Sequence, residues 1–259
     1  LPHPDRELAA DAAASADAAM DRALALLEPD AVRIDDASYA GRLRGARNAA
    51  RGVVVVVPGL DSSKEEFHDV TEALLARGSA VFTMDGPGQG VRAATTTVTA
   101  DYDKVLARVV DALHERLGPV PVGVVGLSLG GYYAAWSTAH EPRIRAAVTV
   151  SGPSRITGWD DTVPFVRETL TQRAGSADAA REFLARVDLR GAAARIAVPL
   201  LVVDGADDVI PGVENGARLA AGAPGAVYMS VPGGDHLLGN VRDAWLPDAA
   251  DWLVERLGG

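Results

Sequence analysis

The stretch VGVVGLSLGGYYAAW, residues 122–136, decides how the sequence is interpreted. Its first half is an apolar, β-branched run typical of a buried strand, and its second half is a small-residue run typical of a helix. A chain that passes from strand to helix so abruptly needs corner residues without bulky Cβ atoms, and Gly126, Gly130 and Gly131 meet that need. Ser128 is therefore expected at the tip of a tight turn.

The rest of the chain alternates in the same way between apolar runs and helical patterns. GVVVVVPG, residues 52–59, is too short for a helix and too continuous for a surface strand, so it indicates a buried strand of a parallel sheet. Further strands are expected at 79–85, 120–126, 145–152, 198–205 and 226–233, and helices at 6–28, 63–77, 100–117, 129–140, 213–221 and before 257. The predicted class is α/β, with a mostly parallel central sheet covered by helices on both faces.

One stretch, residues 153–197, interrupts this alternation. About 45 residues separate two strands where a simple crossover needs far fewer, and helical patterns begin near Thr162 and after Gly175. We expect a helical lid over the carboxyl ends of the strands, where open α/β sheets bind ligands; a solvent-facing excursion is the alternative. The expected division is an N-terminal helical segment (1–51), the lid (153–197), and a core formed by 52–152 and 198–259.

Composition limits the classes of function. The chain has 259 residues, 48% of them hydrophobic, which suits one large domain. The formal net charge of −10 argues against nucleic acid or an anionic membrane as a partner. Cysteine is absent, which excludes disulfides and thiolate chemistry, and no apolar run approaches a membrane span. We expect a soluble, cytoplasmic protein; because it begins at Leu1 rather than Met, we also expect processing or trimming, with a removed leader as one option.

Gly126-Leu127-Ser128-Leu129-Gly130 fits G-x-S-x-G between a strand and a helix, the pattern of a nucleophile elbow. A serine hydroxyl needs a histidine to accept its proton and a carboxylate to orient that histidine. These partners are expected downstream in the order acid, histidine. His236 follows the strand at 226–233, whereas His3 is terminal and His68, His114 and His140 lie in predicted helices. The acid is open among Asp204, Asp207 and Asp208, which share one loop.

An acyl-transfer site also needs two hydrogen-bond donors for the oxyanion. The backbone N–H of Leu129, directly after the serine, is the first candidate. The second is the backbone N–H of Leu60, which follows flexible Gly59 in the loop after the strand at 52–59. An ordinary strand-to-helix turn is the alternative interpretation of each segment.

Residues 52–257 resemble the α/β-hydrolases, and three motifs narrow the resemblance. GLDSSKEEF (59–67), DGPGQG (85–90) and GLSLGG (126–131) are similar to the subgroup that contains 2,6-dihydroxypseudooxynicotine hydrolase and fungal hydrolases that shorten polyketide pigment precursors. The resemblance implies a serine triad of Ser128, Asp207 and His236, with the oxyanion loop at Gly59-Leu60. It also implies cleavage of a carbon–carbon bond beside a ketone, in a retro-Claisen type of reaction.

The resemblance further suggests lid residues that contact substrate. Some relatives place an additional carboxylate in the lid, and the candidates here are Asp160 and Asp161 beside Trp159, with Phe165 nearby. Aspartates that begin a helix on the lid surface are the alternative. The sequence departs from the subgroup in two respects. The first is that only about 50 residues precede the first matched strand, whereas the relatives have a longer helical region that contributes to the pocket and the dimer. Val91 follows DGPGQG where an acidic residue is expected.

We therefore predict a serine hydrolase that cleaves such a carbon–carbon bond, or an ester, in a polyketide-like or aromatic small molecule. Esterase, thioesterase or acyl-eliminating activity in natural-product biosynthesis is the alternative, and a homodimer is one option for assembly. A non-catalytic receptor or a scaffold on the same fold would not need the complete set of Ser128, acid and His236. No cofactor or metal is expected, because DGPGQG lacks the phosphate-binding glycine patterns and no metal-ligand spacing is present.

Overall fold

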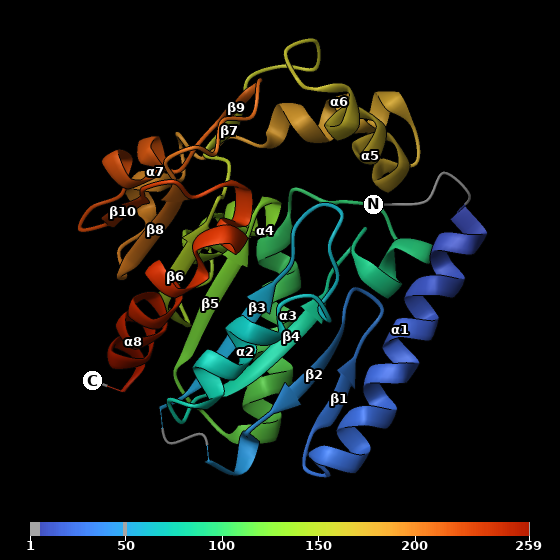
Figure 1. The fold of residues 1–259 in the computed structure, drawn as a ribbon, viewed down its shortest axis with the longest axis vertical. Coiled ribbons are helices and arrows are strands. Elements are labelled where there is room, and N and C mark those ends of the chain that lie inside the picture. The colour runs from blue at the N-terminus through green and yellow to red at the C-terminus, as the bar shows by residue number, and fades with distance from the viewer. Residues whose placement is uncertain (1–5, 49–50, 259) are drawn as a thin grey trace.

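The computed structural model describes residues 6–48 and 51–258, and an eight-stranded sheet lies at its centre (Figure 1). The strand order is β1-β2-β4-β3-β5-β6-β8-β10; β2 is antiparallel to both of its neighbours, and all pairs from β4 to β10 are parallel. This confirms the predicted α/β class. The strands of the sheet are β1 (Val32–Asp35), β2 (Ala40–Arg44), β3 (Val53–Val57), β4 (Ala80–Asp85), β5 (Val122–Leu127), β6 (Ile144–Val150), β8 (Leu200–Gly205) and β10 (Val227–Val231).

Helices cover both faces of the sheet because its central strands are apolar on both sides. In β3, Val53, Val55 and Val57 pack into the core beneath α3 and α4, while Val54 and Val56 pack into the core beneath α2 and α8. The helices of the core are α1 (Arg6–Leu27), α2 (His68–Leu75), α3 (Tyr102–Leu117), α4 (Leu129–Thr138), α7 (Ala217–Gly222) and α8 (Leu246–Leu257), with 3-10 turns η1 (Ala46–Asn48), η2 (Gly90–Ala94) and η4 (His236–Ala244).

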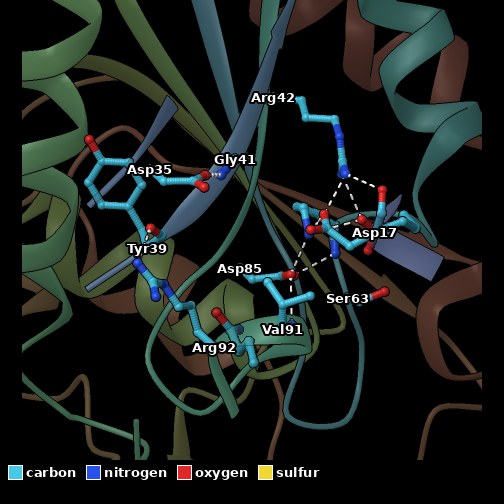
Figure 2. Close-up of polar contacts among 12 residues, drawn as sticks. Asp17, Asp35, Tyr39, Gly41, Arg42, Ser63, Asp85, Val91 and Arg92 are labelled. Carbon is cyan, nitrogen blue, oxygen red and sulfur yellow. Dashed lines mark hydrogen bonds and ion pairs between the residues drawn. The ribbon is translucent and has the colours of Figure 1, made fainter. Parts of the chain in front are cut away.

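The N-terminal segment contains more than the expected helix. α1 is followed by β1 and β2, which extend the sheet at one edge, so residues 32–44 belong to the core architecture. Ion pairs of the buried Arg42 guanidinium of β2 hold α1 against the sheet. Arg42 contacts Asp17 of α1 (Figure 2), and it also contacts the more exposed Asp21 at 2.7 Å. α1 is thus fastened to the sheet by charge as well as by packing.

The helix expected at 63–77 begins later, at His68. Ser63 and Glu66 do make a capping-box type of contact, in which the Ser63 N–H donates to Glu66 Oε1 at 2.8 Å. However, the backbone between them is not helical, because the Lys64 N–H donates to Asp85 Oδ1 at 2.7 Å. Residues 60–66 therefore remain a loop at the carboxyl edge of the sheet.

Residues 153–197 form a lid beyond the carboxyl ends of the strands (Figure 1). Two helices make up most of it, and the short strand β7 joins it to the loop after β8 by antiparallel pairing with β9. The elements of the lid are β7 (Arg155–Ile156), α5 (Pro164–Ala174), α6 (Ala177–Arg186) and the 3-10 turn η3 (Ala193–Arg195); β9 (Val213–Glu214) lies outside it. The lid therefore lies over the edge of the sheet that carries Ser128.

Candidate active site

The turn between β5 and α4 has the geometry that its glycines predict. Ser128 occupies φ 54° and ψ −126°, a conformation that is strained for a residue with a side chain. A Cβ on Gly126 would lie 2.0 Å from the Gly130 carbonyl oxygen, and a Cβ on Gly130 would lie 2.2 Å from the Val57 carbonyl oxygen. Both positions exclude a side chain, so the helix can start close to the sheet and present Ser128 at the edge.

Ser128, His236 and Asp208 form one hydrogen-bonded chain. His236 Nε2 lies 2.9 Å from Ser128 Oγ, and His236 Nδ1 lies 3.0 Å from Asp208 Oδ2. The Asp208 side chain is nearly buried, whereas that of His236 is 36% exposed. A carboxylate at Nδ1 fixes the tautomer in which Nε2 can accept the serine proton.

The acid in contact with His236 is Asp208, and the expectation of Asp207 is corrected. The Asp207 side chain is exposed, and its backbone N–H donates to the Gly234 carbonyl at 3.0 Å. A tight turn follows β8, in which the Asp208 N–H donates to the Gly205 carbonyl at 3.1 Å. Successive side chains in such a turn point in different directions, so a shift of one residue decides which carboxylate reaches the histidine. Asp204, the third candidate, is buried within β8.

The two expected oxyanion donors lie beside the serine. Leu60 and Leu129 line the same cavity as Ser128. Leu129 is the first residue of α4, where a backbone N–H has no acceptor within its own helix. The loop that carries Leu60 passes very close to the serine, because a Cβ on Gly59 would lie 3.0 Å from Ser128 Cβ. Two backbone amides and the positive end of a helix are thus available near the hydroxyl.

A cavity of about 440 Å³ opens over Ser128, a volume suited to a small organic molecule. Its walls are largely apolar, and the lid contributes six of the lining residues: Pro153, Ile156, Val163, Phe165, Val166 and Leu170. The polar groups of the wall belong mainly to the core: Asp61, Ser62, Glu66, Ser128, Ser151, Asp208, Asn215 and His236. The site therefore combines a reactive edge with an apolar roof.

Of the four lid candidates, the structure brings one to the cavity. Phe165 lines it, although its side chain is also 43% exposed. Asp160 and Asp161 are exposed and do not line it; the Thr157 hydroxyl donates to Asp161 at 3.3 Å. Trp159 instead packs against Arg181, whose guanidinium carbon lies 4.9 Å from the ring centroid. The lid-carboxylate expectation is corrected: both aspartates belong to an exposed turn before α5 that does not line the cavity over Ser128.

Ser151 is a site residue that the sequence analysis missed. It follows β6 at φ 51°, and its Oγ accepts a hydrogen bond of 2.9 Å from the N–H of Leu237, the residue after His236. Leu237 and Leu238 also have positive φ values, 68° and 52°. Ser151 thus holds an unusual backbone turn that carries the histidine. The only signal in the sequence was a Ser-Gly pair at the end of a strand.

Within residues 6–48 and 51–258, no group of three or more histidine, aspartate or glutamate side chains could hold a metal ion. No helix in the same described residues is both long and apolar enough to cross a membrane.

A family model described as the alpha/beta hydrolase fold matches residues 52–192. A 2,6-dihydropseudooxynicotine hydrolase from Paenarthrobacter nicotinovorans is 33% identical over 211 residues, which cover 79% of this chain and 57% of that protein. The 20-hydroxy-prefusarin hydrolase FUS2 of Gibberella moniliformis is 34% identical over 124 residues, 41% of this chain and 29% of that protein. The chain therefore spans less than two thirds of the length of these relatives.

Solved structures agree with the sequence relatives. The crystal structure of a 2,6-dihydroxy-pseudo-oxynicotine hydrolase matches with a TM-score of 0.80 and 29% identity, covering 92% of this chain and 71% of that one. AbyA5 has the same fold, with a TM-score of 0.78 at 19% identity, over 99% of this chain and 81% of that one. Because the family model matches more than half of the chain and the fold agrees, this chain belongs to the α/β-hydrolase family of enzymes.

Proposed function

We propose that this chain is a serine hydrolase whose triad is Ser128, His236 and Asp208. Its substrate is an aromatic or polyketide-like small molecule, in which it cleaves a carbon–carbon bond beside a ketone or an ester bond. The observation that carries the proposal is the hydrogen-bonded chain from Asp208 through His236 to Ser128, open to an apolar cavity. The resemblance to named hydrolases of similar sequence supports the choice of substrate class.

In the proposed first step, Ser128 Oγ attacks the substrate carbonyl carbon and its proton passes to His236 Nε2. Asp208 stabilises the imidazolium that forms. The oxygen of the tetrahedral adduct becomes an oxyanion and accepts hydrogen bonds from the N–H groups of Leu60 and Leu129. Both donors are part of the backbone, so the charge is stabilised without reorganisation of side chains.

Collapse of the adduct breaks the bond to the leaving group, which departs with the bonding electron pair. An alkoxide or an enolate then takes the proton from His236, and an acyl group remains on Ser128. Water then attacks the acyl carbon while His236 takes one of its protons. The second adduct collapses by breaking the bond to Ser128 Oγ, which takes the proton back from His236, and a carboxylic acid is released. Since Asp160 and Asp161 lie outside the cavity, the proton for a carbon leaving group comes from His236 in this scheme.

The experiment is the mass of the products formed from a matched pair of substrates, an aryl ester and an aryl β-diketone, by the wild type and by Ser128→Ala. Serine-dependent cleavage of the diketone supports carbon–carbon hydrolysis, and cleavage of the ester alone makes the protein an esterase. Loss of the serine is expected to lower the rate on the order of 10⁴-fold or more. Retention of more than about one percent of activity would contradict the covalent scheme.

A further inference from the structure

Gln89, in the loop between β4 and η2, has an unusual set of contacts for a side chain that the reaction scheme does not use. It is 1% exposed. Its amide nitrogen Nε2 donates to two successive backbone carbonyls, Pro58 O at 2.6 Å and Gly59 O at 3.1 Å. Both carbonyls belong to the loop that approaches Ser128. Gln89 therefore holds, through these two hydrogen bonds, the backbone directly before Leu60, whose N–H is one of the two proposed oxyanion donors.

The hydrogen bond to the Gly59 carbonyl also fixes the direction of the Leu60 N–H. The C=O of Gly59 and the N–H of Leu60 belong to one planar, trans peptide group and point in opposite directions. A carbonyl that is held toward Gln89 thus directs the Leu60 N–H away from Gln89. Leu60 and Ser128 line the same cavity, and Gln89 does not. Since Gly59 has no side chain and few steric limits on its backbone, an external hydrogen bond is needed to fix this orientation.

Gln89 is itself held by a second pair of contacts at the other end of its amide. Its Oε1 accepts hydrogen bonds from the Tyr102 hydroxyl at 2.8 Å and from the Gly86 N–H at 2.9 Å. Tyr102 is fully buried and stacks on Tyr133 with ring centroids 3.9 Å apart. With both acceptor contacts filled, the amide cannot rotate to exchange its oxygen and nitrogen without losing them.

The same β4 to η2 region holds the far end of the oxyanion loop. Asp85, which is fully buried, accepts hydrogen bonds at 2.7 Å from both the N–H and the ammonium group of Lys64. Figure 2 shows Asp85 at one end of a series of ionic contacts, which continues through the Lys64 ammonium and Asp17 to Arg42. Residues 58–64 are thus clamped at one end by Gln89 and at the other by Asp85. Both clamps come from the motif DGPGQG.

We propose that Gln89 is a positioning residue of the oxyanion hole, which sets the direction of the Leu60 N–H through its hydrogen bonds to Pro58 and Gly59. This inference rests on the proposed function, because it assumes that the Leu60 N–H stabilises an oxyanion. It assigns a task to the glutamine of DGPGQG that is separate from phosphate binding and from substrate contact. Gln89 is absent from the residues that line the catalytic cavity.

The test is Gln89→Met, which keeps length and volume but removes both donors. With an aryl ester, kcat is expected to fall about 10²-fold while KM changes less than about threefold, as for loss of an oxyanion donor. An aryl trifluoromethyl ketone, which adds Ser128 Oγ and places a negative oxygen in the hole, should lose affinity by a similar factor. A ground-state competitor that forms no adduct should bind as it does to the wild type.

The matched control is Thr71→Val, which removes another buried hydrogen bond, from Thr71 Oγ1 to the Phe67 carbonyl at 2.9 Å in the first turn of α2; neither residue lines the catalytic cavity. It is expected to lower the melting temperature and leave kcat unchanged. If Gln89→Met loses no more kcat than Thr71→Val, or binds the ketone as the wild type does, the inference is wrong. Tyr102→Phe removes only the hydroxyl behind Gln89 and should lower kcat several-fold at constant KM; an unchanged kcat would overturn the inference if Gln89→Met does not fold.

Ester cleavage and fluorophosphonate labelling of the wild type distinguish failure of this inference from failure of the proposed function. If the wild type neither cleaves the ester nor reacts with a fluorophosphonate at Ser128, the proposed function fails and the inference with it. If the wild type does both and Gln89→Met keeps full kcat, the inference alone fails.

Discussion

At the scale of single residues, Asp207 and Asp208 can be compared directly, because they are neighbours in the chain and only Asp208 contacts His236. Asp208→Asn should lower kcat on the order of 10⁴-fold, because an amide can no longer hold the imidazole in the tautomer that accepts the serine proton. Asp207→Asn should change kcat less than about twofold, since this side chain is exposed and does not contact His236. Steady-state kinetics of both variants with one aryl ester measure the difference. The opposite ranking would restore Asp207 to the triad.

Asp204 gives a prediction about pH. Burial raises its pKa to about 6, from an ordinary value of 3.8. The folded protein therefore binds this proton more tightly than the unfolded chain, and stability should fall as the pH rises through about 6. Asp204→Asn removes this ionisation. The free energy of unfolding of the variant minus that of the wild type should therefore be on the order of 2 kcal/mol more positive at pH 8 than at pH 4.5.

Urea unfolding of the wild type and Asp204→Asn at the two pH values measures this difference. Asp207→Asn is a suitable control, because it makes the same substitution at an exposed side chain three residues further along the chain. A difference between Asp204→Asn and the wild type that does not vary with pH would show that ionisation of Asp204 is not linked to folding.

The site residues differ in how far the sequence could predict them. Ser128 has a local signature, because glycines at fixed spacing are needed to turn the chain, and His236 follows from the chain order and the end of a strand. Asp208 has no such signature, since the turn that separates it from Asp207 depends on backbone bonds to Gly205 and Gly234. Gln89 was invisible because its partners are carbonyls some 30 residues away in sequence.

At the scale of elements, the lid decides which substrates fit. Phe165 lies on α5 and lines the cavity, whereas Trp159 precedes α5 and packs on Arg181 outside it. Phe165→Ala should raise KM for an aryl substrate about fivefold, the equivalent of about 1 kcal/mol of lost apolar contact, with kcat nearly unchanged. Trp159→Ala should leave KM unchanged. Equal effects of the two substitutions would contradict the assignment of the lid faces.

The elements themselves were predictable to different degrees. β3 and β5 consist of apolar residues and glycine, and β8 begins with four apolar residues before Asp204. Such runs are typical of strands that are buried on both faces, so the positions of these strands follow from the sequence. β1 has alternating exposure and only four residues, so its pattern is too short to distinguish from a loop. The late start of α2 was not predictable, because the buried Asp85 that draws the Lys64 backbone away belongs to another strand.

At the scale of the whole molecule, one ionic cluster joins the N-terminal helix to the catalytic edge. The Lys64 ammonium is 1% exposed and contacts Asp85 at 2.7 Å, Asp17 of α1 at 2.8 Å and Glu65 at 2.9 Å. Nearby acidic groups raise the pKa of Lys64 despite its burial, so it stays charged. The cluster thus couples the docking of α1 to the loop that carries Leu60.

Lys64→Met should therefore destabilise the entire fold. Removal of one partner leaves Asp85 buried without its cation, a change that typically costs about 3–5 kcal/mol of the free energy of unfolding. Arg77→Met, which breaks a largely exposed pair with Asp251, should cost less than about 1 kcal/mol. Denaturant unfolding of both variants measures the contrast. Equal and small losses would show that the cluster contributes little to stability.

A covalent acyl-enzyme on Ser128 can be detected by the mass of the intact protein, quenched during turnover of an aryl ester or aryl β-diketone. We expect an added mass equal to the acyl group, located by peptide mapping on the segment that contains Ser128 and absent from Ser128→Ala. Turnover without any adduct, together with activity retained in Ser128→Ala, would contradict this expectation.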